Sequence, residues 1–290
     1  MKVVNVLIRI VVAAAAYVVG NIIMGVLAPT LHLPAYKPLG GETAHHAALL
    51  MLLASPLLIV GLLPLAAHLK GTWSQRCAAI GALIYVILGL NTLIEAKVFT
   101  NVLTGSPWLA SLQWILPALL TAAAITYNFG EVQSADGALD RLATSGLLWR
   151  VPVAWLIWPV IYIFFGMCVG PFVLHYYQAQ SGALGLHIPS AAVIFRTQLL
   201  RSAFFLAASL PAIVLWTKSR GRLIFALGLA HAMTVGIFPL VQASFFPMTL
   251  RIAHGLEISG DSFAYAAVLG LLFVRSVKSN KPAAQAAAAG

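Results

Sequence analysis

The sequence predicts an all-α fold, a polytopic membrane bundle of about eight transmembrane helices, from its composition and from the spacing of its apolar runs. Of the 290 residues, 61% are hydrophobic and only 8% are charged. A soluble domain carries roughly a quarter charged residues and about half apolar ones. No soluble core could bury this much apolar surface, so lipid must solvate much of the chain.

The apolar runs have the length that a bilayer requires. A backbone in hydrocarbon must satisfy its own hydrogen bonds, so an apolar run of about 20 residues indicates a spanning helix. The first run follows Lys2 and is longer than the apolar segment of a signal peptide, so we interpret it as an uncleaved span. The runs cover residues 3–28, 45–69, 77–99, 108–129, 151–175, 189–216, 222–244 and 247–274.

Basic residues bound these runs asymmetrically. Eleven lie at one set of run ends, whereas only Lys37 and Lys97 lie at the other. Because Lys and Arg accumulate in cytoplasmic loops, both termini are predicted to be cytoplasmic, in a bacterial-type cytoplasmic membrane. The same rule explains the net charge of +10, so no nucleic-acid partner is predicted. The eleven are Lys2, Lys70, Arg76, Arg141, Arg150, Lys218, Arg220, Arg222, Arg275, Lys278 and Lys281.

The two halves of the chain resemble each other. The pattern LIEAxxF at 93–99 matches LVQAxxF at 240–246, and Pro64 matches Pro211, each at an offset of 147 residues. We therefore predict a 4+4 parallel internal repeat about an axis along the membrane normal. The predicted parts are a first four-helix repeat (1–129), a cytoplasmic linker (130–149), a second four-helix repeat (150–275) and a disordered cytoplasmic tail (276–290).

Ionisable residues inside the runs point to a polar site. Each costs at least ~2.5–3.5 kcal/mol on insertion scales. The last run holds Arg251, His254, Glu257 and Asp261, and the last three share one helical face. A rise of ~1.5 Å per residue from the inner ends places all the candidate side chains in the outer half of the bilayer. The substrate-binding or proton-coupling candidates are Arg201, Asp261, Glu257, His254, Gln198, Glu95, Asn91 and Gln242.

Depth suggests a partner for Arg201. The estimated depths of Arg201 and Asp261 differ by only about 4 Å, so we expect them to form an ion pair, with Glu257 as the alternative carboxylate. Arg196 lies about 140° around the helix from Arg201 and is interpreted as an interface anchor. A purely structural interpretation stays open, in which these charges lock helices together and Arg196 and Arg251 extend to the interface.

Three functions remain open. A carrier for a small polar or anionic solute would use Arg201 to hold an anion and Glu257 or Asp261 to take a coupling proton, with bending at Pro64, Pro211 and Pro239. A membrane-embedded enzyme would act on a lipid-linked substrate from the outer face, with His254 and Glu257 as acid and base. The chain could also be a non-catalytic membrane subunit.

Shape should separate the first two functions. A carrier needs a polar path to both sides, whereas a blind, outward-facing pocket would favour the enzyme. The sequence holds no G-x-S-x-G, no H-E-x-x-H and no glycine-rich phosphate loop. Although His254, Glu257 and Asp261 could offer three ligands from one helix, their spacing is no recognised zinc signature. We predict no metal and no cofactor, and a small molecule or a lipid as the ligand.

Overall fold

The computed structural model describes residues 3–34, 43–103, 105–130, 146–179 and 185–274, and their regular structure is helical apart from two isolated β-bridges. Within these ranges eight helices are long and apolar enough to cross a membrane. The prediction of a multi-pass helical membrane protein is therefore confirmed. The predicted linker and tail lie outside the described residues, apart from Gly130 and residues 146–149.

The first four spans use polar caps at several of their starts. Thr43 accepts a hydrogen bond from the His46 backbone N–H, and Thr72 forms a capping box with Gln75. The elements are α1 (Val3–Thr30), α2 (Ala44–Ala66), a third span of α3 (Trp73–Ala82), η1 (Leu83–Asn91) and α4 (Thr92–Phe99), and a fourth span of α5 (Pro107–Ser111), η2 (Leu112–Trp114) and α6 (Ile115–Phe129).

In the last four spans only the seventh is segmented, whereas in the first four both the third and the fourth are. Ser190 caps the sixth span by accepting from the Val193 backbone N–H. The elements are α7 (Leu147–Ala179), α8 (Ala191–Leu215), a seventh span of α9 (Arg220–His231), η4 (Ala232–Ile237) and α10 (Phe238–Gln242), and α11 (Met248–Phe273). The predicted span ends agree with these bounds to within four residues.

Two spans contain a π-helical segment that sequence reasoning missed. The segment is η1 in the third span and η4 in the seventh. Pro239 is the second residue after η4 and has no N–H to donate to Val235, which disfavours α-helical hydrogen bonding there. Pro64 and Pro211, where bending was also expected, lie inside α2 and α8. Each lacks the N–H that would close a helical hydrogen bond, and the bending there stays a prediction.

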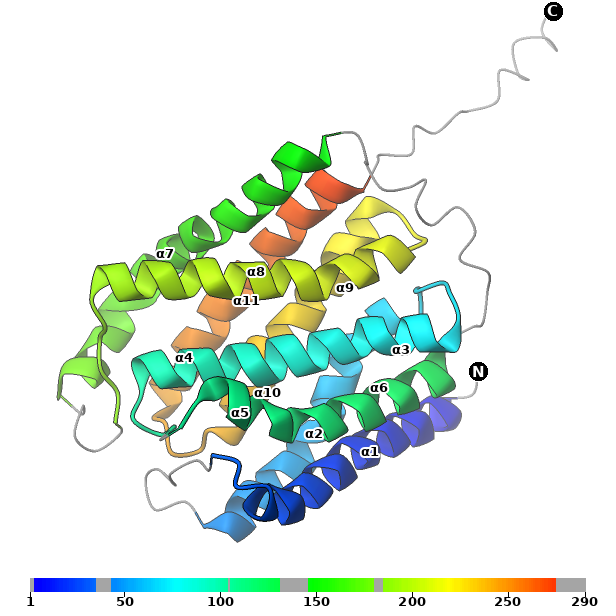
Figure 1. Ribbon diagram of the computed structural model, residues 1–290, viewed down its shortest axis with the longest axis horizontal. Coiled ribbons are helices and arrows are strands. Elements are labelled where there is room, and N and C mark those ends of the chain that lie inside the picture. Colours follow the sequence, from blue (N-terminus) through cyan, green and yellow to red (C-terminus); the bar gives the residue numbers. More distant parts are fainter. Residues whose placement is uncertain (1–2, 35–42, 104, 131–145, 180–184, 275–290) are drawn as a thin grey trace, which may run out of the picture.

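The first four spans form one group and the last four a second, and the two groups pack against each other around a shared core. Figure 1 shows the first group in the lower part of the view and the second above it. Helix α1 packs on α2 and α6, and α7 packs on α8 and α11. The groups meet where α2, α3 and η1 contact α8, α9 and η4. The candidate site lies next to this contact.

The two ends of the bundle differ. In Figure 1 the start of α1 and the end of α11 lie at one end. There the connections after α2 and α8 pair, with the Lys70 backbone N–H donating to the Leu215 carbonyl at 2.9 Å. At the other end, the connections after α4 and before α8 pair between Thr100 and Leu186. We call this second end the distal end.

Candidate functional site

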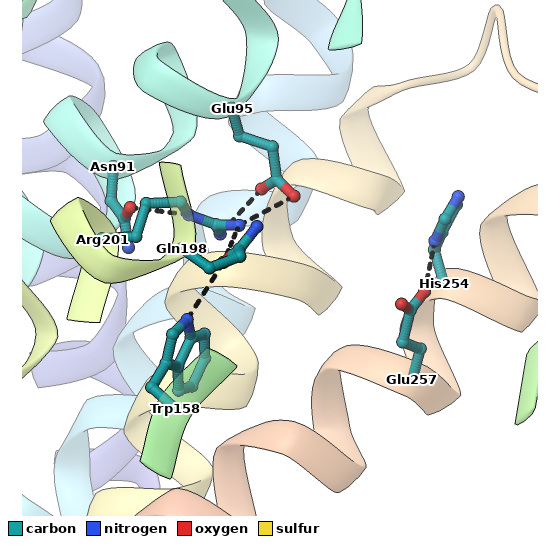
Figure 2. A network of polar contacts seen from close by, with 7 residues as sticks. All are labelled: Asn91, Glu95, Trp158, Gln198, Arg201, His254 and Glu257. Carbon is teal, nitrogen blue, oxygen red and sulfur yellow. Dashed lines mark hydrogen bonds and ion pairs between the residues drawn. The ribbon is translucent and has the colours of Figure 1, made fainter. Parts of the chain in front are cut away.

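Arg201 on α8 is the centre of a buried polar cluster. Its Nη1 and Nη2 donate to the two carboxylate oxygens of Glu95 on α4, at 3.0 and 2.9 Å (Figure 2). Its Nε donates to Asn91 Oδ1 at 2.8 Å, and Nη1 also donates to Gln198 Oε1 at 3.2 Å. Only 2% of the Arg201 side chain is exposed. This is the two-pronged geometry in which a guanidinium binds a carboxylate most strongly.

Residues about one turn apart on the same helix supply most of this cluster. Asn91 and Glu95 are four residues apart at the junction of η1 and α4, and Gln198 and Arg201 are three apart on α8. Gln198 is held in turn by Trp158 Nε1 of α7, which donates to its Oε1 at 3.1 Å. The cluster therefore ties the third span to α8 and α7, across the contact between the two groups of spans.

A second polar group lies on α11, separate from the first (Figure 2). His254 Nδ1 and Glu257 Oε2 are 2.6 Å apart, and His254 Nε2 lies 3.2 Å from the hydroxyl of Tyr177 on α7. A carboxylate on one imidazole nitrogen fixes the ring and leaves the other nitrogen to exchange a proton. The three side chains form a Tyr177–His254–Glu257 chain of hydrogen bonds.

A cavity of about 620 Å³ separates the two groups. Glu95, Tyr177, His254 and Glu257 line it, whereas Arg201 does not. Its walls reach the distal end of the bundle and are otherwise mostly apolar. The remaining lining residues are Thr43, Ala47, Leu88, Thr92, Ala96, Phe99, Thr100, Val102, Trp114, Tyr162, Leu186, Val235, Pro239, Leu240, Gln242, Ala243, Phe245, Phe246 and Ile258.

The predicted ion pair between Arg201 and Asp261 is wrong, because Arg201 binds Glu95. The alternative partner, Glu257, is bonded to His254 instead. Estimated depth did not separate the carboxylates, since counting along the spans puts Asp261, Glu257 and Glu95 all within about 4 Å of Arg201. Asp261 is 2% exposed and its Oδ1 has no hydrogen-bond partner.

Of the remaining ionisable or polar residues noted in the sequence, one lines the cavity and the others lie outside it. Gln242 lines the cavity and donates from Nε2 to the Phe238 carbonyl of its own helix at 3.3 Å. Arg251 donates to the carbonyls of Leu240 and Val241 at 2.8 and 3.1 Å, so it satisfies the end of α10. Arg196 is exposed, in keeping with the interpretation of an interface anchor.

Sequence reasoning missed three aromatic members of the site, all on α7. They are Tyr177, Trp158 and Tyr162, whose ring lies 5.8 Å from the Arg201 guanidinium carbon in a cation–π contact. Their spacing along α7 was the available signal, because Tyr and Trp hydroxyl and N–H groups need partners in a membrane interior. Without a known partner on another helix, that spacing could not assign a role.

Within the described ranges, no group of three or more His, Cys, Asp or Glu side chains could hold a metal ion. Comparison of the chain with models of known families, with curated proteins and with solved structures finds no match. The fold and the site thus define a class, an integral membrane protein of eight spans with a cavity among them.

Proposed function

We propose that this protein binds an amphipathic, lipid-like molecule in the cavity and acts on its polar end by acid–base chemistry. The observation that carries the proposal is the distribution of side chains around the cavity. Its walls are mostly apolar, while Glu95, Tyr177, His254 and Glu257 form its ionisable part together with Tyr162. Pockets of this size that bind small molecules combine apolar walls with a few polar groups in the same way.

The Tyr177–His254–Glu257 chain supplies the chemistry in this proposal. With the Nδ1 proton shared with Glu257, His254 Nε2 carries the lone pair that accepts a proton from a substrate hydroxyl or from Tyr177. The apolar surroundings exclude competing water and strengthen these contacts.

Arg201 has a positioning role in this proposal. Its donors are directed at Glu95, Asn91 and Gln198, and it does not line the cavity. A solute anion would have to displace Glu95 from it. The polar end of the ligand is therefore better matched by a hydrogen-bond donor or a cation, which Glu95 and Glu257 can accept.

Co-purifying lipid tests the proposal. Extraction and mass spectrometry of the purified protein should find one amphipathic molecule in stoichiometric amount. Leu240→Trp places a larger side chain in the cavity wall and should remove it. Leu256→Trp is the matched control, because Leu256 is an exposed residue of α11. Equal retention by both variants would contradict binding in the cavity.

The chemical step is tested separately. His254→Ala and Glu257→Gln remove the proposed base and the group that orients it, while the apolar walls stay intact. Both variants should retain the molecule but accumulate it in an unreacted form, so that extracts differ in mass from the wild-type extract. Identical extracts from wild type and both variants would leave binding without catalysis.

A carrier is the second candidate, and the paired π-helical segments favour it. The segments η1 and η4 contact each other where the two groups of spans meet, and π-helical segments often occur at functional sites. A carrier would expose the inner half of this contact in one state. Thr234→Cys should then react with a thiol reagent from the side opposite the cavity, whereas a blind pocket would leave it unreactive.

We also propose that the chain arose by duplication of a four-span unit, with the repeats related by an axis along the membrane normal. Two further sequence matches and two structural observations support this. Gly81 and Gly228, Gly89 and Gly236, and the bridged pair of Leu69 and Trp216 are each 147 residues apart, and the π-helical segments occupy corresponding spans.

The proposed topology has both termini and the α2–α3 connection in the cytoplasm of a bacterial-type cell, and the distal end outside. In a variant lacking Cys77 and Cys168, Asn101→Cys should be labelled from outside by an impermeant thiol reagent. Ser219→Cys at the other end of the bundle should be protected until the membrane is opened. The reverse pattern would invert the assignment and place the cavity on the cytoplasmic side.

A further inference from the structure

We propose that Asp261 is a proton-binding site inside the membrane, and that its carboxyl exchanges its proton with the cavity through Glu257. This goes beyond the proposed function, because Asp261 neither lines the cavity nor belongs to the Tyr177–His254–Glu257 chain. It assigns a separate site, one helical turn deeper in the bundle than Glu257.

Asp261 differs from the other two carboxyl groups of the site in having no basic partner among the described residues. Among the described residues of the site, Glu95 is neutralised by Arg201, and Glu257 is paired with His254. Asp261 has no cation of its own, although it lies within electrostatic reach of Glu257, Arg201 and Glu95. An ionised Asp261 would add a negative charge that has no cation of its own to this buried cluster, whereas a protonated Asp261 adds no charge.

The surroundings of Asp261 offer no substitute for a cation. Its Oδ1 has no hydrogen-bond partner, and the same holds for Ser262 Oγ, which is also buried. Helix α11 packs on α7, α9, η4 and α10. The charged groups that act on Asp261 are Glu257 of its own helix, Arg201 of α8 and Glu95 of α4. His231 of α9 stacks on Tyr265 of α11, and its Nε2 lies 2.9 Å from Ser209 Oγ.

Glu257 provides the route to the cavity. It precedes Asp261 by four residues on α11, a spacing that brings Cβ atoms to about 5–6 Å. Its Oε2 contacts His254, while its Oε1 faces Gly166 of α7, where a Cβ would lie only 3.4 Å away. The missing side chain at Gly166 leaves room beside Oε1.

The transfer conserves charge at each step. The Asp261 carboxyl gives its proton to the Glu257 carboxylate, directly or through one water, which leaves Asp261 ionised and Glu257 neutral. Glu257 then protonates His254 Nδ1 in the tautomer that carries its hydrogen on Nε2, and the Nε2 proton leaves to the cavity, which restores the neutral Nδ1–H ring. The return of a proton along the same groups restores Asp261.

Carbodiimide labelling tests the protonation of Asp261 in the wild-type protein. Dicyclohexylcarbodiimide partitions into membranes and reacts with protonated carboxyls to give a stable acylurea, which mass spectrometry locates by residue. We expect Asp261 to be labelled in preference to Glu95, whose carboxylate is held by Arg201. The labelling rate should fall by about tenfold per pH unit once Asp261 ionises.

Three results would overturn the proposal. They are no label at Asp261 at any pH, a rate at Asp261 that does not change with pH, and protection of Asp261 by sodium ions, which would make it a cation site. Labelling of Asp261 that is lost on Asp261→Asn and unaffected by sodium supports it.

A stability comparison gives an independent readout. Asn matches the shape of a neutral aspartic acid, so Asp261→Asn should leave the melting temperature of the purified protein close to that of wild type. Glu95→Gln, which breaks an ion pair, should lower it. If Asp261→Asn lowers the melting temperature as much as Glu95→Gln does, then Asp261 is ionised and the proposal fails.

Discussion

The third and seventh spans share a framework and differ in charge. Each consists of an α-helix, a π-helical segment and a short second α-helix. Gly89 in η1 lies where a Cβ would be 2.7 Å from Trp114 Cγ, and Gly236 in η4 lies where a Cβ would be 2.8 Å from Ile258 Cγ2. Each glycine thus lets its span approach the last span of its own half.

The difference lies six residues after the glycine in each span. Glu95 forms two hydrogen bonds with Arg201 of the opposite half. Gln242, at the corresponding place, bonds only to its own helix among the described residues. The residue that corresponds to Arg201 in α2 is Ala54, which is buried and apolar. The packing framework is therefore common to both halves, while the ion pair is present in one.

Breaking the ion pair is the largest expected effect. Glu95→Gln leaves Arg201 buried without a carboxylate and should lower the free energy of unfolding by ~3–5 kcal/mol. Arg201→Gln should cost less, because the Glu95 side chain is 30% exposed to the cavity and can be hydrated there. Reversible unfolding in mixed micelles measures both values.

The double variant checks the interpretation. Glu95→Gln with Arg201→Gln leaves no lone charge and should recover part of the loss, so the two single effects should not add. Strict additivity would mean that the two side chains act independently. Two single variants as stable as wild type would mean that the contact contributes nothing to stability.

Sequence reasoning reached the fold more easily than the site. Apolar runs and their basic flanks suffice for eight spans because lipid forces every backbone group into a helix. The partner of Arg201 was predicted to be Asp261 and is Glu95 in the structure. This error shows what residue counting along the spans does not give. Counting along a helix gives depth, but it does not say which helices are neighbours or where each face points. That information comes from packing between distant parts of the chain.

The π-helical segments were missed for a related reason. Around η4, Pro239 gives a local signal, but η1 contains no proline and reads as an ordinary apolar helix. Gly89 matters there because Trp114 packs against it from another span. A glycine in an apolar run has many possible roles, so the sequence alone does not identify this contact.

Replacing Gly89 or Gly236 by alanine should lower stability by similar amounts, and by less than breaking the ion pair does. Gly89→Ala and Gly236→Ala each place a methyl group within 2.7–2.8 Å of a neighbouring side chain, so each should lower stability by about 1–3 kcal/mol. Gly221→Ala is the matched control, because nothing lies within 4 Å of its Cβ position. If only one of the two variants is destabilised, the framework is less symmetric than the proposed duplication requires.

The smallest expected effect is at Gln242. Its one hydrogen bond, to the Phe238 carbonyl, is 3.3 Å long and half-buried, and it joins no second element. Gln242→Ala should therefore cost only about 0.5–1.5 kcal/mol, the net value of an ordinary hydrogen bond. Glu95→Ala should lower the free energy of unfolding several times more, because it also leaves Arg201 buried without a carboxylate partner. Measuring both alanine variants under the same conditions compares the two spans at matched positions. Equal losses would mean that Gln242 has a partner of its own across the bundle, and that the polar contact is present in both halves.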